Sequence, residues 1–189
     1  MSQTNYGFNM ALGVPGGIYD LSPHHIVSET LDDGASANPG MGLVRGATAG
    51  ETVKLPVTAS TAAEFEGVFV NGSKQLEHDT KGNVAAVGAD TVGIMKSGRI
   101  WALIASTATV AYAGGVALIT EGENAGKFTD ASDASETKKV ALTGVTFTGK
   151  IDKDTGIAVI EIKAFGGTNE WKERQEDMMR RTTATCMEA

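Results

Sequence analysis

The sequence predicts a mainly β protein: a small β-barrel core with a long extended N-terminal arm and a short C-terminal helix. Short apolar runs alternate with turns that contain Gly, Asn and Asp from residue 51 onward, a pattern typical of barrels and sandwiches. The 24 glycines fit a chain that turns often. Both ends differ in texture from the middle, which divides the chain into an arm (1–50), a barrel (51–165) and a tail (166–189).

The first 50 residues hold three of the four prolines and many of the glycines, so regular structure should be scarce there. Segment 13–34, GVPGGIYDLSPHHIVSETLDDG, carries only sparse apolar side chains. Burying each would contribute about 1.5–3 kcal/mol, whereas ordering the backbone costs about 1–2 kcal/mol per residue. We therefore expect this arm to become ordered only when it lies across a pre-formed surface.

The middle of the chain reads as a series of strands. We expect them at residues 52–58, 65–70, 91–95, 99–105, 110–119 (with a break at two glycines), 127–129, 139–148 and 157–162. Pro56 moves the first of these towards a sheet edge, because proline lacks the N–H that a ladder needs. Asn71-Gly72 predicts a hairpin after the second strand, since both residues tolerate positive φ.

Three further turns are predicted from their composition. Lys96-Ser97-Gly98 should form a hairpin that contains the candidate residues Ile94, Gly98, Arg99 and Trp101. GENAG should join the strands before and after it, and so should GKIDKDTG. DASDASETKK reads as an exposed polar loop.

The tail predicts a short helix. Asn169 is a candidate N-cap, with acidic residues early and Arg180-Arg181 later, the order that a helix dipole favours. Trp171, Met178 and Met179 share one face of it. A helix this short is marginal alone, so it should dock either on its own barrel or on a neighbouring subunit.

Charge and hydropathy exclude several classes. A net charge of −7 disfavours nucleic-acid binding and adsorption to anionic membranes. The uncharged run 100–120 is long enough to span a bilayer, but its polar middle, Gly114-Gly115 and flanks without cationic clusters favour two buried strands. The first ten residues show no signal peptide, which predicts a protein that is made and stays in a cytoplasm-like compartment.

No catalytic or metal-binding motif emerges. His24 and His25 would point to opposite sides of an extended chain, and no second ligand cluster lies at metal spacing, so we expect no metal and no cofactor. Glu64 and Glu66 have the spacing of a glycosidase pair, yet the polar side of a strand explains them better. Asp152 begins a run that resembles a calcium loop but lacks its Gly and Glu, so it predicts a turn. We expect that the protein is not an enzyme.

Five segments resemble the structural cement, or capsid decoration, proteins of tailed bacteriophages: ALGVPGGIYDLSPHHIVS, STAAEFEGVFVNG, QLEHD, TVGIMKSGRIWALI and GIAVIEI. The resemblance covers roughly four fifths of the chain, and is lost from Gly166 on. It implies a homotrimer on the outer surface of the virion, assembled in the host cytoplasm. The trimer would sit at three-fold and quasi-three-fold positions of the expanded capsid and clamp neighbouring major capsid subunits.

By this resemblance the partners are the major capsid protein and further copies of the chain, with no direct contact to nucleic acid or membrane. The barrel is the core and the arm reaches over capsid subunits. The candidate arm residues are Pro15, Gly16, Gly17, Ile18, Tyr19, Leu21, Pro23 and His24. The alternative is a β-rich virion module for host-surface glycan attachment. It would need exposed aromatic side chains for sugar stacking, and Trp101 and Trp171 are the only tryptophans.

Overall fold

The computed structural model describes residues 12–72, 77–78, 84–136 and 138–163. This part is mainly β, as predicted, and contains no α-helix in the residues described. Its elements are β1 (His25–Leu31), β2 (Ser36–Ala37), β3 (Gly42–Arg45), β4 (Thr52–Lys54), the 3-10 turn η1 (Ala62–Glu64), β5 (Phe65–Phe69), β6 (Glu77–His78), β7 (Val84–Val87), β8 (Thr91–Leu103), β9 (Gly115–Ile119), β10 (Phe128–Asp130), β11 (Lys139–Asp152) and β12 (Ile157–Ile162). The predicted C-terminal helix lies outside the described residues.

Five strands form a closed barrel, which we call the first ring. Its order is β1–β4–β3–β5–β8, and the antiparallel pairing of β1 with β8 closes it. Large apolar side chains fill its interior: Leu31, Leu43, Val53, Phe69, Val92 and Ile94. The prediction of a small β-barrel core is confirmed. A short sheet of β2, β7 and β6 lies beside it.

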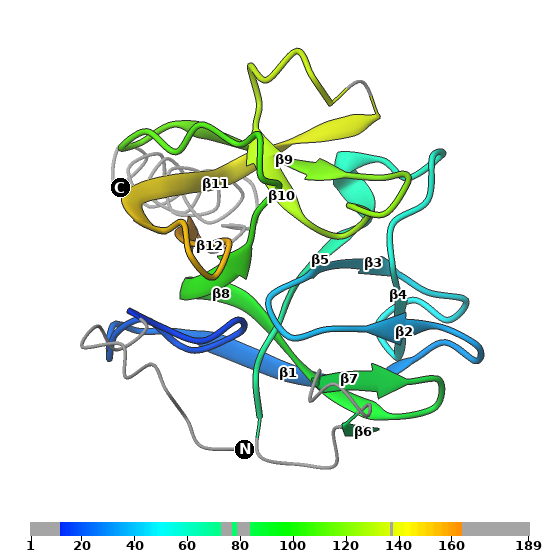
Figure 1. Cartoon of the computed structure of the whole chain (residues 1–189). Helices are drawn as coiled ribbons and strands as arrows, with labels where there is room; N and C mark the ends of the chain where they lie inside the picture. The colour runs from blue at the N-terminus through cyan, green and yellow to red at the C-terminus, as the bar shows by residue number, and fades with distance from the viewer. Residues whose placement is uncertain (1–11, 73–76, 79–83, 137, 164–189) are drawn as a thin grey trace, which may run out of the picture.

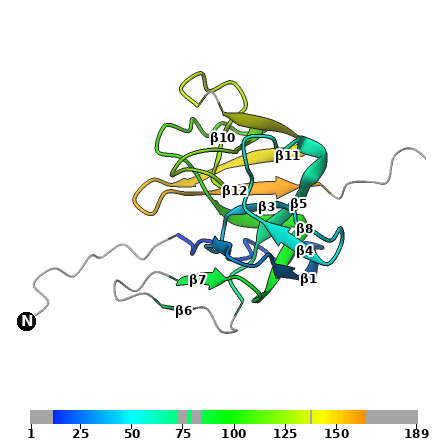
Figure 2. The ribbon, with the colours of Figure 1, turned by 90° about the vertical axis from the view of Figure 1, so that its right-hand side faces the viewer.

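A second ring of strands shares β8 with the first. It runs β8–β12–β11–β9–β10, and a single parallel bridge between Ile104 and Phe128 joins its two ends. The Ala105 N–H donates to the Phe128 carbonyl at 2.9 Å at this bridge. Figure 2 shows β10, β11 and β12 stacked above the strands of the first ring. One large apolar cluster, which includes Phe65, Met95 and Phe147, spans both rings.

The predicted hairpin at Lys96-Ser97-Gly98 is wrong, because β8 is one strand of 13 residues. Its first half pairs with β1 and β5, and its second half pairs with β12. Gly98 lies at the change of partners with φ +124°. Partners on both sides keep the chain extended where the Lys-Ser-Gly composition alone suggested a reversal. Of the four residues assigned to this hairpin, Ile94 lies before Gly98 in the strand and Arg99 and Trp101 lie after it.

Replacing Gly98 with Ala should destabilise the protein by about 1–3 kcal/mol. The φ of +124° is one that L residues rarely adopt, and the added Cβ would stand 2.7 Å from His24 Cβ. Gly93→Ala in the same strand is the control, because there the nearest atom is 3.6 Å away. Urea unfolding of both variants measures the difference, and equal midpoints would contradict the assigned constraint.

The expectation that residues 1–50 contain little regular structure is wrong for residues 25–45. β1 and β3 are members of the first ring, and β2 pairs with β7. The Asn71-Gly72 hairpin is also wrong, because β5 pairs with β3 and β8. Long-range partners for the β-branched and apolar residues outweigh the local turn and breaker signals in both places.

Other predicted elements differ mainly in their ends. The strand expected at 52–58 stops at Lys54, and the one expected at 110–119 begins only at Gly115. The two later hairpins are confirmed, with β9 pairing with β10 and β11 with β12. Asp152 Oδ1 accepts the Asp154 N–H at 3.1 Å and thereby shapes the second turn.

Candidate functional site

Residues 12–24, which we call the arm segment, lie along β8 of their own chain (Figure 1, dark blue). The Gly16 N–H donates to the Trp101 carbonyl at 2.7 Å, and the Trp101 N–H donates to the Gly17 carbonyl at 2.9 Å. The Tyr19 N–H donates to the Arg99 carbonyl at 3.0 Å. In the structure the arm segment therefore lies against the second half of β8.

Trp101 forms the floor under the arm segment. It is 6% exposed and packs with Ile157 and Val159 on one face of β8 and β12. The Tyr19 ring meets it edge-on with centroids 5.7 Å apart. Gly13 lies so close to the indole that a Cβ there would stand 2.4 Å from it. Only a segment with glycine at this place can cover the tryptophan so closely.

An ion-pair cluster, which we call the pin, fastens the arm segment to the barrel. Arg99 Nη1 lies 3.1 Å from Asp20 Oδ2, and Arg99 Nη2 lies 3.2 Å from Glu161 Oε1. Asp20 Oδ1 also accepts the Ser22 N–H at 3.1 Å and a bond from the Ser22 hydroxyl. The bonds from Ser22, together with Arg99, hold the pKa of Asp20 below its ordinary value. The Asp20 carboxylate therefore keeps its charge, and its ion pair with Arg99, to lower pH than an ordinary aspartate would.

Above this floor the arm segment presents an apolar strip to solvent. The members are Leu12 (69% exposed), Val14 (54%), Ile18 (41%), Tyr19 (36%) and Leu21 (99%). The strip includes three of the candidate arm residues, Ile18, Tyr19 and Leu21. Gly16 is buried, and Pro15 and Gly17 are half-buried, so these three serve the docking rather than the outer surface.

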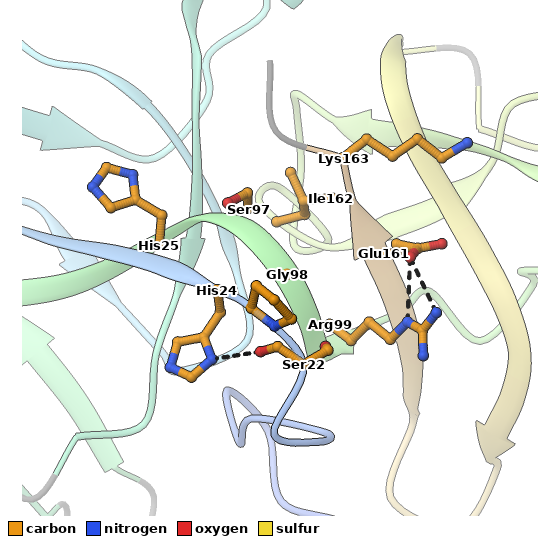
Figure 3. Close-up of a pocket in the computed structure, with 10 residues that line it drawn as sticks. Ser22, His24, His25, Ser97, Gly98, Arg99, Glu161, Ile162 and Lys163 are labelled. Atoms are coloured by element: carbon orange, nitrogen blue, oxygen red, sulfur yellow. Dashed lines mark hydrogen bonds and ion pairs between the residues drawn. The ribbon is translucent and has the colours of Figure 1, made fainter. Parts of the chain in front are cut away.

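An open hollow of about 390 Å³ lies beside the arm segment where it leaves β8 (Figure 3). Its lining includes Pro23, His24 and Lys163. His24 Nδ1 lies 3.0 Å from the Ser22 carbonyl, so the imidazole contacts the backbone two residues before it. A second hollow of about 390 Å³ shares His25 and Ser97 with the first.

Charged side chains from four strands of the first ring meet next to the second hollow. Lys96 Nζ lies 2.7 Å from Glu29 Oε1 and also pairs with Glu66, whose other oxygen lies 3.1 Å from Arg45 Nε. Burial alone would raise the pKa of Glu66, but the hydrogen bonds from Lys96 and Arg45 outweigh it and lower that pKa. Burial likewise opposes the charge on Lys96, yet Glu29 and Glu66 raise its pKa.

The two carboxylates weighed as a glycosidase pair, Glu64 and Glu66, both have structural partners. Glu66 is held by two cations, and Glu64 in η1 accepts the Thr61 N–H at 3.1 Å. Trp101 is covered, so it offers no open face for sugar stacking. Among the described residues no group of three or more potential metal ligands gathers, and no helix there is both long and apolar enough to cross a membrane. Trp171 lies outside the described residues.

Sequence reasoning missed the pin and the charged cluster. It named Arg99 but not its partners Asp20 and Glu161, which stand 79 and 62 residues away. One local signal was readable: an Asp two residues before a Ser is a common turn former. The pairing across β8 and β12 had no such signal.

Three comparisons place the chain among known proteins. Residues 2–163 match the family described as "Structural cement protein (E217 gp24/Pam3 gp6)". A chain from the solved capsid of Myoviridae Phage XM1 shares the fold, with a TM-score of 0.68 and 15% identity over 87% of this chain and 98% of the other. No curated protein matches significantly. The family match spans every described strand and the whole arm segment, so this chain belongs to the structural cement protein family of bacteriophage capsids.

Proposed function

We propose that this protein binds the outside of an expanded phage capsid as trimers, at three-fold and quasi-three-fold positions, and stabilises contacts between major capsid subunits. Membership of the cement family supports a capsid-stabilising role. The observation that carries the surface assignment is the apolar strip on the arm segment. Several exposed apolar side chains gathered in one short segment are typical of protein-binding surfaces.

The proposed capsid-binding arm consists of the residues before His25. Membership of β1 and β3 in the first ring supports this limit. Pro23 and His24 are exposed and lie next to the strip in the chain. Many modest contacts repeated over a lattice add up through multivalency, so each copy needs only a limited surface.

Co-sedimentation with expanded, decoration-free capsids tests this function. We expect saturable binding near one copy per major capsid subunit, because trimers at every three-fold position give that ratio. Compact precursor capsids are the control and should bind far less. Absence of saturable binding to expanded capsids, with folded protein, would contradict the proposal.

Trp101 gives no support to host-glycan attachment, because it is 6% exposed and lies beneath Tyr19. Tyr112 is 85% exposed, and a single exposed ring does not by itself favour this role over capsid binding. A glycan-binding screen on the intact protein would reveal such a role independently of capsid binding.

A further inference from the structure

We propose that Leu21 is the anchor of capsid binding, and that the pin presents it to an apolar pocket on a capsid subunit. This inference rests on the proposed function and adds to it the residue that carries most of the contact energy. Leu21 is 99% exposed, more than any other large apolar side chain among the described residues. A leucine so placed leaves water completely when a partner covers it.

The turn that carries Leu21 is fastened on both sides. Before it, Asp20 pairs with Arg99 and the Tyr19 N–H donates to the Arg99 carbonyl. After it, the Ser22 N–H and hydroxyl bind back to Asp20 Oδ1. The side chain is therefore presented by a backbone that is already ordered, and binding loses less conformational entropy than it would with a free chain.

The size of the strip points to a capsid lattice rather than to a second copy alone. From their exposed fractions, the five strip side chains together offer on the order of 500 Å², within the range of the largest apolar patch on a typical monomer. A stable pairwise interface needs about 800 Å² from each partner. A strip of this size suits a contact that gains its strength by repetition on a surface with many identical pockets.

The chemistry of the partner follows from the groups around Leu21. Arg99 already pairs with both Asp20 and Glu161, so the pin offers no free cation to a partner. Ile18 and Tyr19 precede Leu21 in the chain and are 41% and 36% exposed, so they add apolar surface to the arm segment. The complementary site is an apolar pocket that accepts one leucine, without a buried charge.

A double-mutant cycle on capsid affinity tests both parts of the inference. The variants are Leu21→Ala, Arg99→Gln and their combination, each titrated onto expanded capsids as the full chain. We expect Leu21→Ala to weaken binding at least tenfold, because the apolar burial of a leucine is lost. Arg99→Gln should weaken binding severalfold when Leu21 is present and have no further effect in the Leu21→Ala background.

Val57→Ala is the control for loss of an exposed apolar side chain. Val57 is 50% exposed and lies in the segment between β4 and η1, outside the arm segment. It should leave affinity unchanged. Leu21→Gln is a second variant at the anchor, with a polar side chain close to leucine in size. Leu21→Ala and Leu21→Gln should both fold normally, because Leu21 is fully exposed.

The outcomes separate the inference from the function on which it rests. Wild-type protein that fails to bind expanded capsids contradicts the proposed function itself. Wild-type binding with undiminished affinity of both Leu21 variants overturns the anchor and leaves the function standing. An Arg99→Gln loss that persists in the Leu21→Ala background overturns the positioning role of the pin.

Discussion

Replacing Gly16 with Ala is expected to destabilise the protein by about 3 kcal/mol and to free the arm segment from β8. Gly16 has φ +74°, a conformation that disfavours side chains, and a Cβ would stand 2.7 Å from the Asn71 nitrogen and 2.8 Å from the Phe69 oxygen. Both are backbone atoms within the barrel and cannot turn away as a flexible side chain could. Strain and collision therefore add at this position.

Gly34→Ala is the matched control for this prediction. Gly34 has nearly the same φ, +75°, but a Cβ there would meet nothing within 4 Å. This variant should lose only about 1–2 kcal/mol of stability, the cost of placing an alanine in the left-handed conformation. The difference in unfolding midpoint between the two variants isolates the collision with the barrel. Equal midpoints would show that the arm segment shifts to accommodate the added Cβ at little energetic cost, and would contradict the predicted collision.

Hydrogen exchange distinguishes local release of the arm from general unfolding. The Gly16 and Tyr19 amides donate to β8 in the folded protein. In the Gly16→Ala variant they should lose protection while amides within the second ring keep it. Uniform loss of protection would mean that the arm segment and the barrel unfold together.

Replacing Lys96 with Met is expected to cost about 3 kcal/mol near neutral pH. Glu29 is 5% exposed, and Lys96 Nζ is its ion-pair partner at 2.7 Å. The other carboxylate oxygen of Glu29, Oε2, has no hydrogen-bond partner among the described residues. Removing the cation would leave a buried carboxylate without compensation, the situation that makes broken buried pairs so destabilising.

Two further variants test the cause of that loss. Adding Glu29→Gln to Lys96→Met removes the stranded charge, so the double variant should be more stable than Lys96→Met alone. Arg45→Met breaks the exposed end of the same cluster and should cost no more than about 1 kcal/mol. Chemical denaturation of the set gives the comparison. A double variant that is less stable than the single would refute the uncompensated charge.

The same cluster sets an acid limit on stability. The pKa of Glu66 is lower in the folded protein than its ordinary value of 4.5, so its contribution is present above pH 4.5 and is lost as pH falls below it. The pKa of Lys96 is raised from 10.5, so its contribution persists up to that pH and is lost above the raised pKa. Stability measured against pH should therefore fall below about 4.5, and fall less in Glu66→Gln.

The parts of the fold that could be predicted are those with local causes. The hairpins of β9 with β10 and of β11 with β12 have polar, glycine-containing turns between apolar runs, so composition alone indicates them. The exposed strip could also be predicted in part from the sequence, because Ile18, Tyr19 and Leu21 are apolar residues in a segment that cannot fold on itself.

The rest depends on partners that are distant in the chain. Lys96-Ser97-Gly98 has the composition of a turn, yet neighbours on both sides of β8 hold it extended. Gly13 and Gly16 looked like loop residues, whereas they allow the arm segment to approach Trp101 and the β5 end. Glu29 stands opposite Val92 in the register of β1 against β8, yet its side chain pairs with Lys96 four residues further along β8, a contact that no short pattern reveals.

The sharing of β8 by both rings makes the protein a single cooperative unit. The first half of β8 pairs with β1 and β5 and its second half pairs with β12, and one apolar cluster spans both rings. Opening either ring would expose part of that shared cluster, so the two halves are coupled and partial opening is disfavoured. A protein that belongs to a capsid-cementing family would thus resist strain as one body until it fails in one step.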